Sequence, residues 1–413
     1  MTEATATKAD GYAAFRHQAF QYYWLQKFLN TLAVQIVSVA VSWQIYDLTR
    51  DPFDLGLIGL TQFLPQLALV LFTGAAADMF GRRFIMGMAQ ILETICTTVL
   101  LAMTFAGLIT PLAIFAILAG LGVARAFVGP ASSSLIVSTV PPADFANAVS
   151  WSTACWQIGT IVGPVFGGLL YGVAPELAYA TAAILLAVAC GFTFAIPRPA
   201  ERPKIGGGVL GNILGGFRYI LGEKVVLGAI SLDMFAVLLG GAVALLPVFA
   251  RDILVLGPWG LGLLRAAPGI GAVLTAVWLT RNPIRDHAGI VMFAAVAMFG
   301  IFTSMFAVST LAWVSIIALA LVGAADMISV YVREILLQLW TPDHVRGRVN
   351  AVNNVFVGAS NELGEFRAGM MGAWIGPVDA VIFGGIGSIA VAAIWVWQFP
   401  SLRKIRSLDR SMR

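Results

Sequence analysis

The chain has 413 residues, of which 59% are hydrophobic and only 11% are charged, and its formal net charge is +4. Soluble domains carry roughly 25% charged residues, so a soluble globular fold could not bury this much apolar surface. The composition predicts a protein that crosses a lipid bilayer many times, and it gives no sign of a nucleic-acid partner.

Twelve apolar stretches, bounded by charged residues, proline or glycine, predict membrane helices along the chain. Each stretch has room for the roughly 20 residues that cross the hydrocarbon core. The first six are expected near residues 20–46, 53–77, 84–107, 111–138, 145–173 and 175–196. Six more are expected near residues 225–250, 257–280, 288–308, 310–340, 349–374 and 377–399. The expected fold class is an all-α polytopic membrane protein with 12 transmembrane helices.

The residues before the first stretch are polar and lack the apolar core of a cleaved signal peptide, so the first helix is expected to stay in the mature protein. Cys96, Cys155 and Cys190 lie singly, without the spacing of a disulfide framework or a metal site. We expect no metal and no other cofactor.

The loop after the second predicted helix combines glycines, an acid and two arginines. Gly81 permits a tight turn, and Asp78 can pair with a basic group or a helix N-terminus in one conformation and release it in another. The alternative for the arginines is simple topological anchoring. We predict a conformational latch formed by Gly74, Asp78, Gly81, Arg82 and Arg83.

Arg125 lies within the fourth predicted helix. A charged side chain inside a membrane is costly and is a functional candidate by default. The alternative is a structural ion pair, with Glu93 of the third helix as the expected partner.

The fifth predicted helix carries glycines at four-residue spacing, which leaves a smooth groove along one face for a close neighbour. A proline at the same level weakens the helix. The motif comprises Gly159, Gly163, Pro164, Gly167 and Gly168, and ordinary small-residue packing does not explain the full pattern.

Ionisable residues recur in the predicted helices of the second half, where carboxylates are typical proton carriers. Asp326 and Arg333 are seven residues apart and therefore share a helix face. Asp233 and Asp326 are the preferred pair because their flanks are the most apolar, whereas Arg367 is expected to neutralise Glu365. The alternative is permanent ion pairing with the arginines nearby, including Arg265. The proton-coupling candidates are Arg125, Asp233, Asp326, Arg333, Glu362 and Glu365.

A polar stripe on the eleventh predicted helix cannot face lipid. Its members are Asn354, Gly358, Asn361 and Glu365. The candidates for a substrate cavity are Asn30, Gln44, Gln157, Asn354 and Asn361. Trp43, Tyr46 and Trp151 lie near helix ends and are interpreted as interfacial belt residues.

The chain partly repeats itself at an offset of 203 residues, as from Gly59 to Gly262 and from Asn147 to Asn350. The predicted domains are a first six-helix bundle at residues 1–196, a cytoplasmic linker at 197–224 and a second bundle at 225–413. Parallel repeats of six helices are typical of the major facilitator architecture, where substrate binds near the midplane between the halves.

The basic residues of the predicted loops gather on one side of the membrane, with Arg50 and Arg251 as the exceptions. Because cytoplasmic loops carry an excess of Lys and Arg, both termini are expected in the cytoplasm.

Three longer segments and the motifs above resemble one family. The segments are Trp43–Arg50, Leu246–Asp252 and Arg346–Asn354. Together they resemble the transmembrane secretion effector branch of the major facilitator superfamily, which includes enterobactin and macrolide exporters. Within that resemblance, Arg125 stands where drug–proton antiporters have an arginine implicated in coupling, and the helix 5 motif is similar to the antiporter signature of exporters. The resemblance implies a monomeric, proton-coupled antiporter of the bacterial inner membrane that exports a siderophore, an antibiotic or a similar molecule.

Other functions stay open or are excluded by particular features. An importer, or a transporter of a lipid-like substrate, remains the main alternative. An ATP-driven pump is excluded because no phosphate-binding Gly-x-x-x-x-Gly-Lys-Ser/Thr loop exists. An enzyme is not expected, because His17, His287 and His344 all lie at or outside helix ends.

Overall fold

Helices account for almost all of residues 11–198 and 209–405, which are the residues that the computed structural model describes, and none of these residues forms a strand. The long helices of the first half are α1 (Gln18–Thr49), α2 (Pro52–Phe80), α3 (Arg82–Phe105), α4 (Pro111–Leu135), α5 (Phe145–Val173) and α6 (Pro175–Ala195). Those of the second half are α8 (Lys224–Gly240), α10 (Gly257–Arg281), α11 (Ala288–Val308), α12 (Ala312–Trp340), α13 (Asp343–Ile375) and α14 (Pro377–Gln398).

The shorter elements join or end these helices. They are η1 (Ala13–Arg16), η2 (Ile136–Ser138), η3 (Pro142–Asp144), α7 (Val209–Gly222), η4 (Val243–Leu245), α9 (Leu246–Val248), the π-helix η5 (Phe249–Ile253) and α15 (Pro400–Arg403).

Among the described residues, 10 helices are long and apolar enough to cross a membrane. They are α1, α3, α4, α5, α6, α8 with its continuation to Ile253, α10, α11, α12 and α14. The expectation of an all-α polytopic membrane protein is therefore confirmed. The crossing of α2 and α13, and with it the count of twelve, stays a prediction.

The seventh predicted stretch, 225–250, is not the continuous helix that was expected. The helix α8 ends at Gly240, and the chain continues through η4 and α9 into the π-helix. Gly240 and Gly241 have low helix propensity, and Pro247 has no amide hydrogen for the helical ladder. The broken segment ends in η5, which carries Arg251 and Asp252.

The predicted linker also contains structure that its composition did not indicate. Its helix α7 packs against α13, so closely that a Cβ on Gly216 would lie 2.5 Å from the carbonyl oxygen of Arg348. Residues 199–208 lie outside the described part of the chain, so the division into domains at 197–224 stays a prediction.

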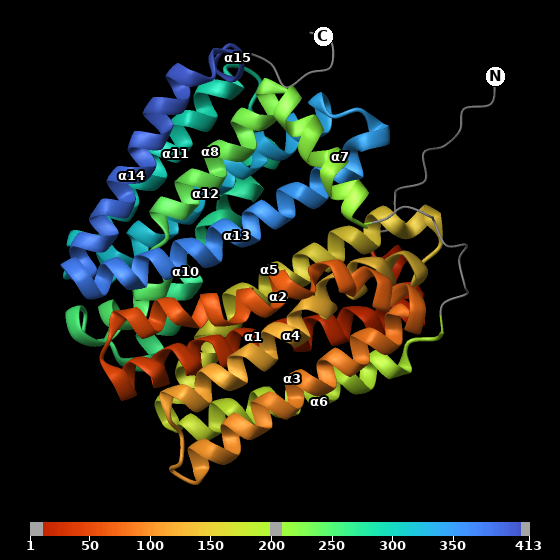
Figure 1. Ribbon diagram of the computed structural model, residues 1–413, viewed down its shortest axis with the longest axis vertical. Coiled ribbons are helices and arrows are strands. Elements are labelled where there is room, and N and C mark those ends of the chain that lie inside the picture. The colour runs from red at the N-terminus through yellow and green to blue at the C-terminus, as the bar shows by residue number, and fades with distance from the viewer. Residues whose placement is uncertain (1–10, 199–208, 406–413) are drawn as a thin grey trace.

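The helices α1–α6 pack mainly on one another, and so do α8–α14, which gives the two lobes of Figure 1. The lobes meet chiefly along two helix pairs, α2 with α13 and α5 with α10. The repeat-related glycines lie at these contacts. A Cβ on Gly262 would lie 2.4 Å from the carbonyl oxygen of Pro164, and one on Gly59 would lie 2.6 Å from Oε2 of Glu362. The absence of a side chain at these positions lets the halves touch.

Glycine also sets the spacing of α10 and α12. A Cβ on Gly271 would lie 1.7 Å from the carbonyl oxygen of Ala320, which is backbone and cannot move aside cheaply. We expect Gly271→Ala to destabilise the protein by roughly 1–3 kcal/mol through overpacking. Thermal unfolding in detergent would measure this loss. Gly191→Ala is the matched control, because nothing lies within 4 Å of its Cβ, and an unchanged melting temperature in Gly271→Ala would refute the packing argument.

Candidate functional site

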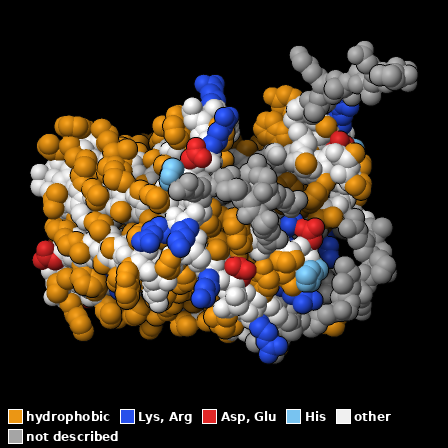
Figure 2. Space-filling view, turned by 90° about the horizontal axis from the view of Figure 1, so that it is seen from above, with side chains coloured by type: hydrophobic (Ala, Val, Ile, Leu, Met, Phe, Trp, Pro, Cys, Tyr) orange, Lys and Arg blue, Asp and Glu red, His pale blue; other side chains and the backbone are white. Residues whose placement is uncertain are grey.

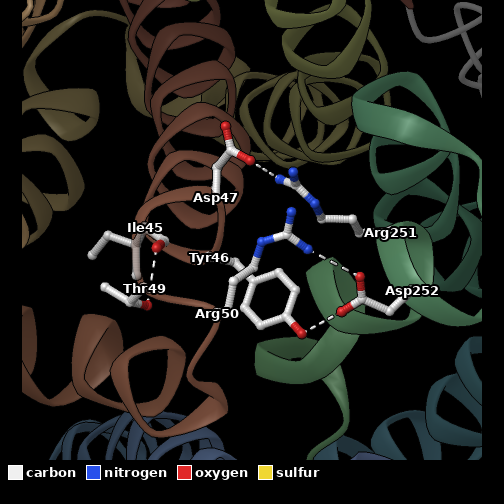
Figure 3. Close-up of polar contacts among 7 residues, drawn as sticks. All are labelled: Ile45, Tyr46, Asp47, Thr49, Arg50, Arg251 and Asp252. Atoms are coloured by element: carbon white, nitrogen blue, oxygen red, sulfur yellow. Dashed lines mark hydrogen bonds and ion pairs between the residues drawn. The ribbon is translucent and has the colours of Figure 1, made fainter.

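Two ends of the helix bundle are distinguished below: the terminal end, where α1 begins and α14 ends, and the far end, where α1 ends and α2 begins. At the far end, α1 is joined to the π-helix by five residues that we call the far-end clasp (Figure 3). They are Tyr46, Asp47, Arg50, Arg251 and Asp252. The Arg251 guanidinium donates to the Asp47 carboxylate, and the Tyr46 hydroxyl donates to Asp252. Nη1 of Arg50 lies 3.3 Å from Oδ1 of Asp252.

Local backbone structure aims these side chains at one another. Arg50 ends α1 in the left-handed region, at φ 55°, and Asp51 then caps α2 by accepting from the amide of Phe53 at 2.8 Å. The chain reverses directly behind Arg50. On the other side, the π-helix presents the neighbouring residues Arg251 and Asp252 to α1 together.

Trp43 and Tyr46 support the clasp instead of facing the membrane surface. They are only 7% and 5% exposed, and the Arg251 guanidinium lies 5.5 Å from the centre of the Trp43 ring. A cation over an aromatic face at this distance is attracted to it. The interpretation of both residues as interfacial belt residues is therefore wrong. The clasp acids were missed, although Arg50 and Arg251 were visible as the exceptions to the charge bias.

A second group of charged residues lies where the halves meet, and we call it the interface cluster. Its members are Glu93 of α3, Arg125 of α4, Arg265 of α10, and Glu362 and Glu365 of α13. Arg125 is close enough to interact electrostatically with Glu93 in its own half and with both α13 glutamates in the other half. Arg125 thus stands between acids of both halves.

Arg265 completes the cluster from the second half. It interacts electrostatically with Glu365, and its Nη1 donates across to the Ser38 hydroxyl of α1 at 2.6 Å. Its Nε is buried and has no hydrogen-bond partner. A buried donor without a partner costs free energy, so this arginine is ready to bind a further acceptor.

The expected neutralisation of Glu365 by Arg367 is wrong. Arg367 points to the break after α8, where its Nε donates to the carbonyl of Leu238 at 3.0 Å. A cation satisfies the free carbonyls at the C-terminal end of a helix. Arg367 therefore stabilises the broken helix, and Glu365 interacts with Arg265 instead.

The preferred coupling pair lies inside the second half. Asp233 of α8 forms an ion pair with Arg333 of α12, and both side chains are buried. Asp326 lies beside them on α12 and interacts electrostatically with both. The structure therefore separates the six coupling candidates into two places: Arg125, Glu362 and Glu365 between the halves, and Asp233, Asp326 and Arg333 within one half.

The latch residues contact only their own half where the structure describes their side chains. Gly81 turns the chain at φ 86°. Arg82 donates to the carbonyl of Ser134 at 3.2 Å, and Arg83 donates to that of Ile196 at 2.6 Å, so the two arginines cap the ends of α4 and α6. The side chains of Gly74 and Asp78 lie outside the described part of the chain, and the latch stays a prediction.

The helix 5 motif joins α5 to two partners. The faces of Gly159, Gly163 and Gly167 meet α1, where a Cβ on Gly163 would lie 2.5 Å from Gln35. Gly168 faces the other half, and its Cβ would lie 2.4 Å from the carbonyl oxygen of Pro258. The motif therefore contributes to the contact between the halves through Gly168 and Pro164.

The cavity candidates separate in a similar way. Asn30 donates to Glu93 at 2.7 Å, and Gln157 is half-buried beside α10. Asn354 and Asn361 are exposed on α13. Gln44 is buried in the first half, where it accepts from Tyr179 at 2.6 Å and donates to Thr104 at 3.2 Å. Since both ends of its amide are occupied, Gln44 joins α1 to its neighbours and does not face a cavity.

Comparison with known proteins gives a consistent family. A family model described as transmembrane secretion effector matches residues 9–412. Similar proteins include the enterobactin exporter EntS of Salmonella choleraesuis (strain SC-B67), 23% identical over 94% of this chain and 94% of that protein. EntS of Escherichia coli (strain SMS-3-5 / SECEC) is also 23% identical, over 96% and 95%.

Solved structures with the same fold include the nucleoside transporter NupG, with a TM-score of 0.72 at 13% identity over 92% of this chain and 100% of that one. Another is the D-xylose-proton symporter, with a TM-score of 0.68 at 15% identity over 93% and 98%. At these identities, the likeness concerns the fold alone.

Proposed function

The chain belongs to the transmembrane secretion effector family of the major facilitator superfamily, and from this premise we propose that it exports a small organic molecule by alternating access. It is a membrane transporter, and its family is not a catalytic one. The similarity to enterobactin exporters over nearly the whole chain supports a siderophore or a molecule of similar chemistry as the substrate.

The far-end clasp is the observation that carries the alternating-access proposal. Among the described residues, the ion pairs between the halves are those of Arg50 and Arg251 with Asp252 and Asp47. The halves are thus closed at the far end, while the glutamates of the interface cluster lie deeper between them. A transporter closed at one end loads its substrate from the other.

The orientation follows from the basic residues. Arg82, Arg83, Arg285 and Arg403 all lie at the terminal end, and Figure 2 shows Lys and Arg side chains gathered on one face of the molecule. The positive-inside bias then places the terminal end and both chain ends in the cytoplasm of a bacterial inner membrane. The closed clasp faces outward, and the site is loaded from the cytoplasm, as export requires.

Proton-coupled antiport completes the proposal, with Arg125, Glu362 and Glu365 between the halves and Asp233, Asp326 and Arg333 in the second half as candidates. Buried ionisable groups are typical of proton pathways in transporters. The protein works as a monomer and without a cofactor in this proposal.

Expression in an Escherichia coli strain without its own enterobactin exporter would test export. We expect the external siderophore to increase several-fold over cells with the empty vector, and Arg125→Met to remove the gain. Antibiotic tolerance of the same cells would reveal a different exported molecule. Unchanged external profiles, or a higher internal level of an added compound, would instead favour an importer.

A further inference from the structure

A small pocket lies inside the second half, between α8, α11 and α12. It is lined by Asp233, Ala236, Val237, Val296, Phe299, Ala325, Asp326 and Ser329. Most of this lining is apolar, and its polar atoms are all oxygens. It is separate from the interface cluster, whose residues come from α3, α4, α10 and α13.

The charges around this pocket do not balance. Asp233 and Asp326 contribute two carboxylates, and the charged groups that interact with Asp326 are Asp233 and Arg333. The helix α11 contributes no ionisable side chain, and the arginine of α10, Arg265, faces Ser38. One arginine serves two acids, so the site lacks one positive charge. Uncompensated charge in a low-dielectric interior is costly.

A further oxygen points to a ligand. Ser329 lines the same pocket and is only 2% exposed, and its hydroxyl has no hydrogen-bond partner. It lies one turn from Asp326 on the same face of α12. Buried hydroxyls are normally satisfied, so a hydroxyl and a carboxylate that face one pocket make a site for a ligand that accepts oxygen donors.

We propose that this pocket binds one monovalent cation, a proton or a sodium ion, held by Asp326 with the Ser329 hydroxyl and Asp233. Arg333 prevents a second cation from binding, because it already neutralises Asp233 through their ion pair. Glu334, whose carboxylate lies 3.9 Å from Nε of Arg333, is 45% exposed and is compensated by water. The proposal rests on the proposed function only for the role of this ion in coupling, because binding does not require a transported molecule.

Two measurements on the purified full-length protein test the site. One is infrared spectroscopy in sodium-free buffer, which detects the C=O band of a protonated carboxyl group. The other is equilibrium binding of ²²Na⁺. A band in the wild type that is absent from Asp326→Asn identifies a proton site. Saturable binding of about one sodium ion per chain, lost in Asp326→Asn, identifies a sodium site, because a carboxylate is the strongest ligand on offer.

Ser329→Ala provides a gentler test. In the sodium case its affinity should fall about tenfold, by the loss of one oxygen ligand worth about one hydrogen bond; in the proton case the carboxyl band should shift in frequency. Asp379→Asn, at an exposed position at the start of α14, is the matched control and should behave as the wild type. If the folded wild type shows neither a difference band nor saturable sodium binding, or if both variants behave as the control does, the proposal is overturned. Siderophore export is measured separately, so failure of one proposal does not imply failure of the other.

Discussion

Reversing the charge of Arg251 is expected to open the far end of the transporter. In Arg251→Asp, a carboxylate replaces the guanidinium that contacts Asp47 and the Trp43 ring. Exposed ion pairs contribute only about 0.2–1 kcal/mol each, but like charges placed together cost several kcal/mol. Since about 1.4 kcal/mol changes an equilibrium tenfold, the population closed at the far end should fall at least about tenfold.

Spin labels at the far end of each half would measure this change as a distance distribution. Leu108 and Trp374 are suitable positions because both are well exposed, and the three native cysteines are buried and can be replaced. The wild type should show mainly the short distance, and Arg251→Asp a longer one. Combining Arg251→Asp with Asp47→Arg should restore the short distance, whereas Arg285→Asp, an exposed reversal at the terminal end, should have no effect. An unchanged distribution in Arg251→Asp would show that the clasp does not hold the halves.

Removing the charge of Arg125 is expected to have the largest effect on transport. Arg125 lies between Glu93 of its own half and the α13 glutamates, so its loss leaves buried carboxylates without compensation. Breaking a buried charge pair costs about 3–5 kcal/mol. Even half of that cost in the transport cycle would slow export by more than about tenfold.

The measurement is the initial rate of siderophore export by Arg125→Met, at equal amounts of protein in the membrane. Arg125→Lys, which keeps the charge, should retain part of the rate, and Arg403→Met, at an exposed position, should retain all of it. A merely structural role would lower the amount of folded protein, which gel filtration reports, and would leave the rate per molecule intact. That last result would remove Arg125 from the mechanism.

Much of the fold could be predicted because membrane helices are written in local composition. The apolar stretch 145–173 corresponds to α5 (Phe145–Val173), and the stretch 288–308 corresponds to α11 (Ala288–Val308). The break after Gly240 was missed because its stabilisation comes from Arg367, which is far away in the sequence. Local composition therefore predicts a helix, and a distant side chain decides where it ends.

The site was less accessible from the sequence, because its contacts join residues about half a chain apart. The segments Trp43–Arg50 and Leu246–Asp252 were noticed only as family features, and in the fold they bind each other through Asp47 and Arg251. Polar residues within a helix also give no direction by themselves. Gln44 binds Tyr179 inside the first half, whereas Asn361 of α13 is exposed.

Everted membrane vesicles test the central claim, proton-coupled export, most directly, because their cytoplasmic face is outside. Radiolabelled enterobactin is added, and the lumen is acidified. Accumulation in the lumen that a protonophore abolishes, and that Arg125→Met vesicles do not show, is the result we expect. No accumulation of the siderophore, or accumulation that is equal with and without the pH gradient, would contradict proton-coupled export of this class of molecule.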